Sequence, residues 1–159
     1  MANFDTFVSA AREFSDWCVS PAGTETEEAR RALSHLVRLY TLALELQFPD
    51  EMDCDRNGER ADDATWKLVY RRAAALPFNY YSDVFDPQTV PSEEPEVGDL
   101  ADDIADIYRD LSEGLDLSDA GLPSEAEWSF RHSFWTHWGR HASSAIKALH
   151  CWLEDTGSW

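Results

Sequence analysis

Two histidines four residues apart are the strongest candidate for chemistry in this sequence. His137 and His141 lie in a segment whose apolar residues recur at helical spacing, so both imidazoles can reach a single ion. A third ligand would come from another segment, with His35 or Asp103 as the candidate. No cofactor is assured, but the spacing predicts a site for a divalent metal in a metal-dependent helical-bundle enzyme.

The alternative for these histidines is a hydrogen-bonded network without a metal. With about 100° between successive residues of a helix, His141 falls inside the apolar arc and His132 on the polar side. A buried imidazole needs hydrogen-bond partners. We therefore expect His141 to be largely buried and bonded to Asp103, Tyr108 or His35, and His132 to be exposed.

Four aspartates predict an acidic face on the helix expected over residues 100–115. They lie away from the apolar stripe of that helix, and Asp102 and Asp106 lie nearly opposite its centre, which indicates a solvated surface. Dense charge of one sign favours association with a basic protein surface. The first functional hypothesis is therefore a non-enzymatic acidic module that binds a protein partner, and the alternative use of Asp102, Asp103 and Asp106 is as metal ligands. The proposed partner-binding residues are Asp99, Asp102, Asp106 and Asp110.

A second candidate ion site lies in the acidic loop before the third predicted helix. Asp53, Asp55, Asn57 and Gly58 reproduce the first half of a calcium-binding loop. The bidentate glutamate that ends such a loop is missing, because Ala64 stands at the twelfth position. We expect calcium binding to be weak or absent, with a solvated Asn-Gly turn as the alternative.

Helices must position these residues, because the apolar residues recur at helical spacing. The second predicted helix is apolar around much of its girth and is expected to be central. Thr24 with Glu27, and Ser124 with Glu127, form capping boxes. Residues 78–98 are expected to be irregular chain and exposed loop. The sequence predicts an all-α fold, a single domain over residues 1–159 formed by a bundle of about five helices, roughly 4–18, 24–47, 62–76, 100–115 and 124–154.

Charge and cysteine content restrict the class of protein. The net charge of −18 repels nucleic acid and anionic lipid, so nucleic-acid binding is not expected. No apolar run reaches the length of a membrane span, so no membrane partner is expected. The cysteines, Cys18, Cys54 and Cys151, contain no close pair, which fits a reducing compartment and predicts a cytoplasmic protein.

Two segments carry a family resemblance. They read GDLADDIADIYRDLSEGL over residues 98–115 and SFWTHWGRHASSAIKALH over residues 133–150. Through the motifs GDLADDIADIYRDL and HWGRH, the chain resembles an uncharacterised bacterial family of small acidic helical proteins, the domain-of-unknown-function family numbered 5063. The resemblance implies an all-helical fold and no established activity.

Overall fold

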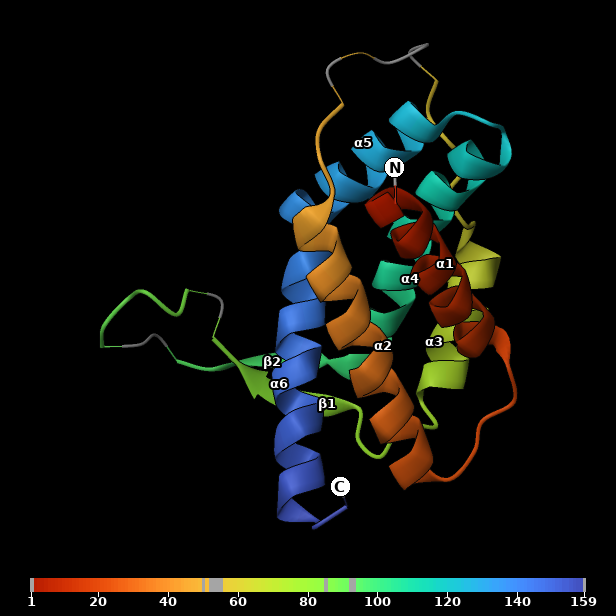
Figure 1. Ribbon diagram of the computed structural model, residues 1–159. Helices are drawn as coiled ribbons and strands as arrows, with labels where there is room; N and C mark the ends of the chain where they lie inside the picture. The colour runs from red at the N-terminus through yellow and green to blue at the C-terminus, as the bar shows by residue number, and fades with distance from the viewer. Residues whose placement is uncertain (1, 50, 52–55, 85, 92–93, 159) are drawn as a thin grey trace.

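The computed structural model describes residues 2–49, 51, 56–84, 86–91 and 94–158, and most of them are helical. The predicted all-α, five-helix organisation is confirmed when α5, η1 and α6 are counted as one helix that continues through a change of direction (Figure 1). η1 is a π-helical turn within this continuous segment. The elements are α1 (Ala2–Val19), α2 (Glu25–Glu45), α3 (Asp63–Ala73), β1 (Tyr80–Asp83), β2 (Glu96–Asp99), α4 (Leu100–Asp119), α5 (Pro123–Ser133), η1 (Phe134–Trp138) and α6 (Gly139–Asp155).

Helix α4 is the central element of the bundle. It packs against α1, α3, α5, η1 and α6. Most of its apolar stripe is buried, with Tyr108 and Leu115 partly buried. At Gly114 a side chain would overlap the ring of Phe130 from α5, so these two helices approach closely. The expectation that the second helix is central is wrong, because α2 leaves Val37 and Leu44 exposed. The buried apolar residues of α4 are Leu100, Ala101, Ile104, Ala105, Ile107, Leu111 and Leu117.

One of the two predicted capping boxes is present. The Thr24 N–H donates to Glu27 Oε2 at 3.1 Å, and Glu27 N–H donates back to the Thr24 hydroxyl at 3.4 Å. The predicted box at Ser124 is wrong, since α5 begins at Pro123 without a side-chain cap. Proline has no N–H to satisfy at the first helical position, and Glu127 instead accepts the backbone N–H of Gln47 at 3.0 Å.

A short antiparallel hairpin, which the sequence prediction missed, joins the bundle at the start of α4. Strands β1 and β2 pair with Tyr80 opposite Asp99 and Tyr81 opposite Gly98. The loop between them projects away from the helices (Figure 1). The prediction of irregular chain is wrong for these two strands, and the described residues between them, 86–91 and 94–95, form an exposed loop as predicted. The strands were missed because they have only four residues each, too few for a clear alternation. No sheet of three or more strands occurs among the described residues.

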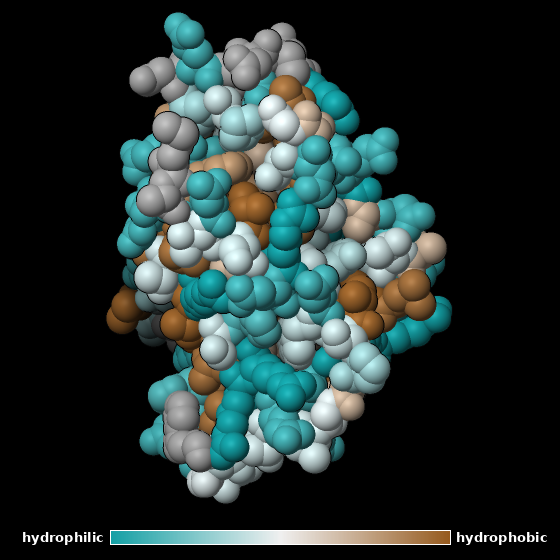
Figure 2. Space-filling view, turned by 45° about the vertical axis from the view of Figure 1, so that its right-hand side comes forward, coloured by the Kyte–Doolittle hydropathy of each residue, from teal (hydrophilic) through white to brown (hydrophobic). Residues whose placement is uncertain are grey.

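Some large apolar side chains are exposed, among them Val19, Leu68 and Val97. On the face in Figure 2 they form small separate groups among hydrophilic residues. Among the helices of the described chain, none has the length and apolar character needed to cross a bilayer.

Candidate metal centre

Three side chains from two packed helices converge on one point. Asp106 comes from α4, His137 from the π turn and His141 from α6, and each offers a ligand atom within 4.8 Å of the others. The Nε2 atoms of His137 and His141 are each 3.8 Å from Asp106 Oδ2. Tetrahedral coordination with metal–ligand bonds of about 2.1 Å would place such atoms about 3.4 Å apart. A contraction of a few tenths of an ångström would bring each histidine to this distance from Asp106, and the three ligand atoms already lie within 4.8 Å of one another.

The other nitrogen of each imidazole is held by a carboxylate. His137 Nδ1 lies 2.7 Å from Asp110 Oδ2, and His141 Nδ1 lies 2.6 Å from Asp103 Oδ1. An ionised carboxylate only accepts hydrogen bonds, so each Nδ1 carries a proton and donates it. In the neutral imidazole the lone pair is then on Nε2, the atom that faces Asp106. This is the carboxylate–histidine arrangement that orients metal ligands in proteins.

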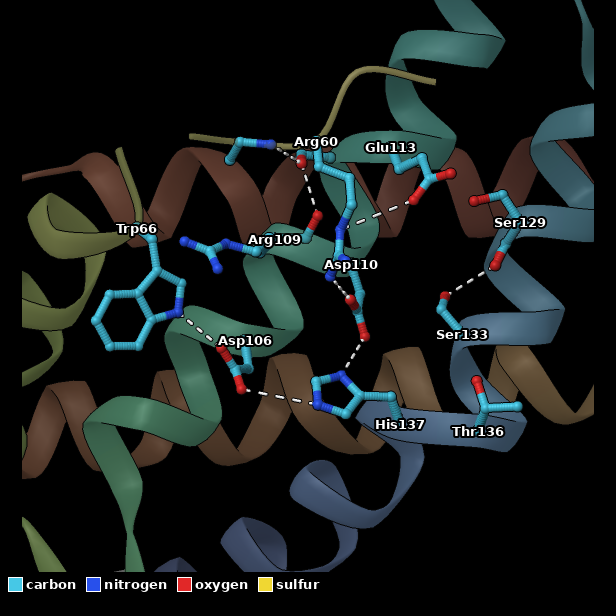
Figure 3. A network of polar contacts seen from close by, with 12 residues as sticks. Arg60, Trp66, Asp106, Arg109, Asp110, Glu113, Ser129, Ser133, Thr136 and His137 are labelled. Carbon is cyan, nitrogen blue, oxygen red and sulfur yellow. Dashed lines mark hydrogen bonds and ion pairs between the residues drawn. The ribbon is translucent and has the colours of Figure 1, made fainter. Parts of the chain in front are cut away.

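The three aspartates divide their oxygens in the same way. One oxygen of each faces an imidazole, and the other accepts a hydrogen bond from a side chain of a different element. These outer donors are Trp66 Nε1 to Asp106 Oδ1 at 2.7 Å, the Tyr81 hydroxyl to Asp103 Oδ2 at 2.6 Å, and the Arg60 guanidinium to Asp110 Oδ1. Figure 3 shows the arms that end at Trp66 and Arg60, with His137 between Asp106 and Asp110. Asp103 and Asp110 are thus hydrogen-bonded at both oxygens, which limits their rotation, whereas Asp106 is hydrogen-bonded at Oδ1.

Negative charge is concentrated around the two imidazoles. The Asp103 and Asp110 side chains are 7% and 5% exposed, while Asp106 is 23% exposed. The hydrogen bond to Asp103 raises the pKa of His141, although partial burial opposes the shift. Burial and then the charge of Asp106 raise the pKa of Asp102. A cation at this point would offset the repulsion among these carboxylates.

The π turn accounts for the register of the histidine-bearing helix. Its amide at Gly139 bonds to the carbonyl of Phe134, five residues earlier. That bond brings the two residues so close that a Cβ on Gly139 would lie 2.5 Å from the Phe134 oxygen. Such turns occur frequently at functional sites. Here the turn contains His137 and directly precedes the helix that carries His141.

The structure brings together part of the predicted histidine set. His137 and His141 are adjacent, with ring centroids 4.7 Å apart. The predicted hydrogen bond from His141 to another helix is confirmed, with Asp103 as partner, and His141 is 24% exposed. His132 is exposed, as predicted, and stacks on the Trp128 ring at 4.6 Å. Asp103 contacts the imidazole nitrogen that faces away from Asp106, so it lies outside the cluster of Asp106, His137 and His141.

His35 is absent from the cluster, so the prediction that it completes the metal site is wrong. It lies on α2 and stacks on Trp17 of α1, with ring centroids 5.5 Å apart. Burial against these rings lowers its pKa. His35 therefore belongs to the contact between α1 and α2.

The acidic face of α4 is less exposed than predicted, because its aspartates are paired with neighbouring side chains or half-buried. Asp110 is buried and paired with Arg60, and Asp106 accepts from Trp66. Asp99 caps α4 by accepting the N–H groups of residues 101 and 102, and accepts the Tyr70 hydroxyl at 2.9 Å. Asp102 is half-buried. Of these four aspartates, Asp110 is buried and the other three are partly exposed. Their predicted role in binding a partner stays a prediction.

The candidate calcium loop lies partly outside the described residues, which exclude Asp53 and Asp55. Gly58 packs on the backbone of Glu113, where a Cβ would overlap it. Asp62, a potential replacement ligand, instead caps α3 by accepting the Thr65 N–H at 2.8 Å. Weak or absent calcium binding stays a prediction.

Sequence reasoning missed the outer donors Trp66, Tyr81 and Arg60. They come from α3, β1 and the preceding loop, so no spacing along the chain relates them to the histidines. It placed Asp106 on a solvated face and offered it as a metal ligand only as the alternative. The one available signal was the spacing of Asp103, Asp106 and Asp110, which places all three on one side of a helix.

Comparisons with known proteins identify the fold and the family. No curated protein matches this chain. The crystal structure of protein BF1032 from Bacteroides fragilis is similar, with a TM-score of 0.75 and 21% sequence identity over 93% of this chain and 90% of that one. At this identity the similarity shows a shared fold alone. The family model described as "Domain of unknown function (DUF5063)" matches residues 1–154, which confirms the resemblance found in the sequence. The chain therefore belongs to the DUF5063 family.

Proposed function

We propose that this protein is a metal-dependent enzyme that binds one divalent transition metal ion through Asp106, His137 and His141. The observation that carries the proposal is the orientation of both imidazoles. Each donates its Nδ1 proton to a buried aspartate and turns Nε2 toward the same oxygen of Asp106.

The distances favour an ion over a hydrogen-bonded network. At 3.8 Å, neither Nε2 is close enough to Asp106 Oδ2 for a hydrogen bond. Within the described chain no hydrogen bond from either Nε2 is found, whereas both Nδ1 atoms have short ones. A shared cation accounts for the separation of these Nε2 atoms and for their common direction.

The donor set and the accessibility of the site support catalysis. Two imidazoles and one carboxylate suit zinc or ferrous iron, and an ion with three protein ligands keeps a position for water or substrate and acts as a Lewis acid. The His137 side chain is 45% exposed, so the ligand atoms are reachable from solvent. Metal-assisted hydrolysis is the reaction class that best fits these ligands.

The protein-partner hypothesis has less support. Three of its four aspartates have intramolecular roles: Asp99 caps α4, Asp106 is the proposed ligand and Asp110 supports His137. A basic partner would have to displace Arg60 or the histidines to reach Asp110. We therefore favour the metal-dependent enzyme over the partner-binding module.

Metal stoichiometry tests the proposal. Chelator-treated protein titrated with zinc in a calorimeter should bind one ion per chain, and Asp106→Ala or His141→Ala should abolish that binding. His132→Ala is the matched control, because His132 is exposed on the same continuous helix and should retain full stoichiometry. Zinc-loaded protein should also hydrolyse aryl ester or phosphate ester substrates faster than the chelated protein. Binding that survives both ligand variants would refute the site.

A further inference from the structure

The β1–β2 hairpin contacts Asp103, the aspartate that supports His141. Tyr81 of β1 donates its hydroxyl to Asp103 Oδ2 at 2.6 Å, and the other oxygen of Asp103 accepts from His141 Nδ1 at 2.6 Å. Burial, followed by the bond to Asp103, raises the pKa of Tyr81 far above its ordinary value. The phenol therefore stays protonated and acts as a donor. Two hydrogen bonds therefore connect Tyr81 of the hairpin, through Asp103, to the imidazole of His141.

Gly98 sets the direction of the Tyr81 ring. The two residues lie opposite each other in the antiparallel pair, and a Cβ on Gly98 would overlap the Tyr81 ring. The ring can lie across β2 only because this position has no side chain. From there its hydroxyl reaches α4.

The hairpin is joined rigidly to the helix that it contacts. Asp99, the last residue of β2, caps α4, and the Leu100 N–H donates to the Asn79 carbonyl at 2.7 Å just before β1. Asp103 lies one turn further along α4. The distance from the strand pair to Asp103 is therefore fixed by backbone hydrogen bonds at both strands.

We propose that Tyr81, with Gly98 beneath its ring, is a positioning residue of the metal centre. This inference rests on the proposed function. Without the phenol, Asp103 keeps its bond to His141 but loses the donor that stops the carboxylate from rotating. The imidazole then loses its fixed direction toward the ion. Changes to such outer partners of metal ligands weaken binding by about 10- to 100-fold.

The same contact implies that metal binding stabilises the hairpin. If an ordered hairpin strengthens metal binding, metal binding must strengthen the hairpin by the same factor, because coupling free energies are reciprocal. The backbone amides of β1 and β2 should exchange with solvent more slowly in the zinc-loaded protein. Amides at the remote end of α1 should change much less.

The test compares zinc affinity in three variants of the full chain. Tyr81→Phe keeps the ring and removes the hydroxyl, so its affinity should fall by about 10- to 100-fold. Gly98→Ala keeps Tyr81, Asp103 and His141 but displaces the Tyr81 ring, so its zinc affinity should fall by a similar factor. Tyr80→Phe is the matched control, since Tyr80 is the neighbouring residue of the same strand and 64% exposed, and it should bind as wild type does.

Two further readouts separate positioning from general stability. Cobalt(II) absorption reports ligand geometry, so Tyr81→Phe should shift the spectrum even at saturating cobalt, which a purely structural role would leave unchanged. Wild-type affinity in Tyr81→Phe, or hairpin amide exchange that ignores zinc, would overturn this inference while leaving the metal site intact. Absence of zinc binding in the wild type would instead refute the proposed function.

Discussion

At the residue scale, the centre depends on carboxylates that each serve two neighbours. Asp103, Asp106 and Asp110 follow one another at three- and four-residue spacing along α4, so they share one side of the helix. That side faces the histidine-bearing helix, and each aspartate has a different outer donor. A carboxylate held at both oxygens fixes the direction of an imidazole more closely than a solvated carboxylate would.

Asp106→Asn should separate metal binding from folding. The amide oxygen can still accept the Trp66 N–H, and loss of one negative charge relieves repulsion with Asp102. In chelator, the free energy of unfolding should change by less than about 1 kcal/mol. Zinc at a hundred times its dissociation constant should stabilise the wild type by about 2.7 kcal/mol and the variant hardly at all.

Urea melts with chelator or zinc measure both quantities. Asp116→Asn is the control on the same helix, because Asp116 pairs with Arg56 and is not among the ligands, and it should keep the zinc response. A zinc response retained by Asp106→Asn would contradict the assignment of this ligand.

His141 should make metal-free stability depend on pH. Its pKa is raised in the folded protein, chiefly by the bond to Asp103. The resulting stabilisation is fully present below the unfolded pKa of about 6.5 and is lost as the pH rises through the higher folded value. In chelator, His141→Ala should therefore cost more stability at pH 6 than at pH 9, with His132→Ala as control.

Zinc affinity should have the opposite pH dependence to this stabilisation. The ion must displace the proton on His141, so binding should tighten as the pH rises through the same range. Urea melts and calorimetry across the pH series give both curves. An equal cost of His141→Ala at both pH values would exclude a charged imidazole paired with Asp103.

At the element scale, the π turn reconciles the apolar spacing with helical geometry. Buried residues recur every four positions from Ala126 to Trp138. In an α-helix each such step drifts by about 40°, which accumulates to about 120° over three steps. A wider turn takes up part of this drift and keeps the line of buried residues on the core. His137 and His141 follow the same four-residue step and therefore stay on one side.

Gly139→Ala tests the π turn. In an ordinary helix this substitution stabilises by up to about 1 kcal/mol. Here the methyl group would lie 2.5 Å from the Phe134 carbonyl oxygen, so the variant should lose about 1–3 kcal/mol and bind zinc more weakly. Urea melts measure the stability. The control, Ser143→Ala at an exposed position of α6, should stay within about 0.5 kcal/mol of wild type. Stabilisation by Gly139→Ala would show that the turn is not constrained at this glycine.

Long amphipathic elements were predictable from the sequence, and irregular ones were not. The helical period of α4 gives its buried stripe directly, and Thr24 gives the start of α2. The π turn was missed because a fixed angle per residue assumes an unbroken α-helix. The hairpin was missed because Tyr81 and Gly98 are seventeen positions apart and only their pairing gives either a role.

At the scale of the whole molecule, the chain carries a net charge of −18, part of which is concentrated at the centre. Such charge destabilises a compact state by self-repulsion. The sequence indicates the histidine pair through its spacing alone. It offers Asp103 as one of several partners for His141 but does not indicate that Asp106 and Asp110 also turn toward the histidines, because that direction depends on which helices pack together.

Salt should stabilise the protein. Raising sodium chloride from 10 to 500 mM shortens the screening length from about 30 Å to a few ångströms, which weakens repulsion among the acidic groups. Exposed pairs such as Arg12–Asp119 also weaken, but each contributes at most about 1 kcal/mol. The urea midpoint of metal-free protein should therefore rise with salt. A falling midpoint would show that the ion pairs outweigh the net repulsion.

The central claim is that a metal ion is held by Asp106, His137 and His141. Anomalous diffraction at the zinc edge, from crystals of the zinc-loaded protein, tests it most directly. The account predicts a strong peak about 2.0–2.2 Å from Asp106 Oδ2 and from both Nε2 atoms, with the Nδ1 bonds to Asp103 and Asp110 retained. A zinc-loaded crystal with no peak between these three side chains would contradict it.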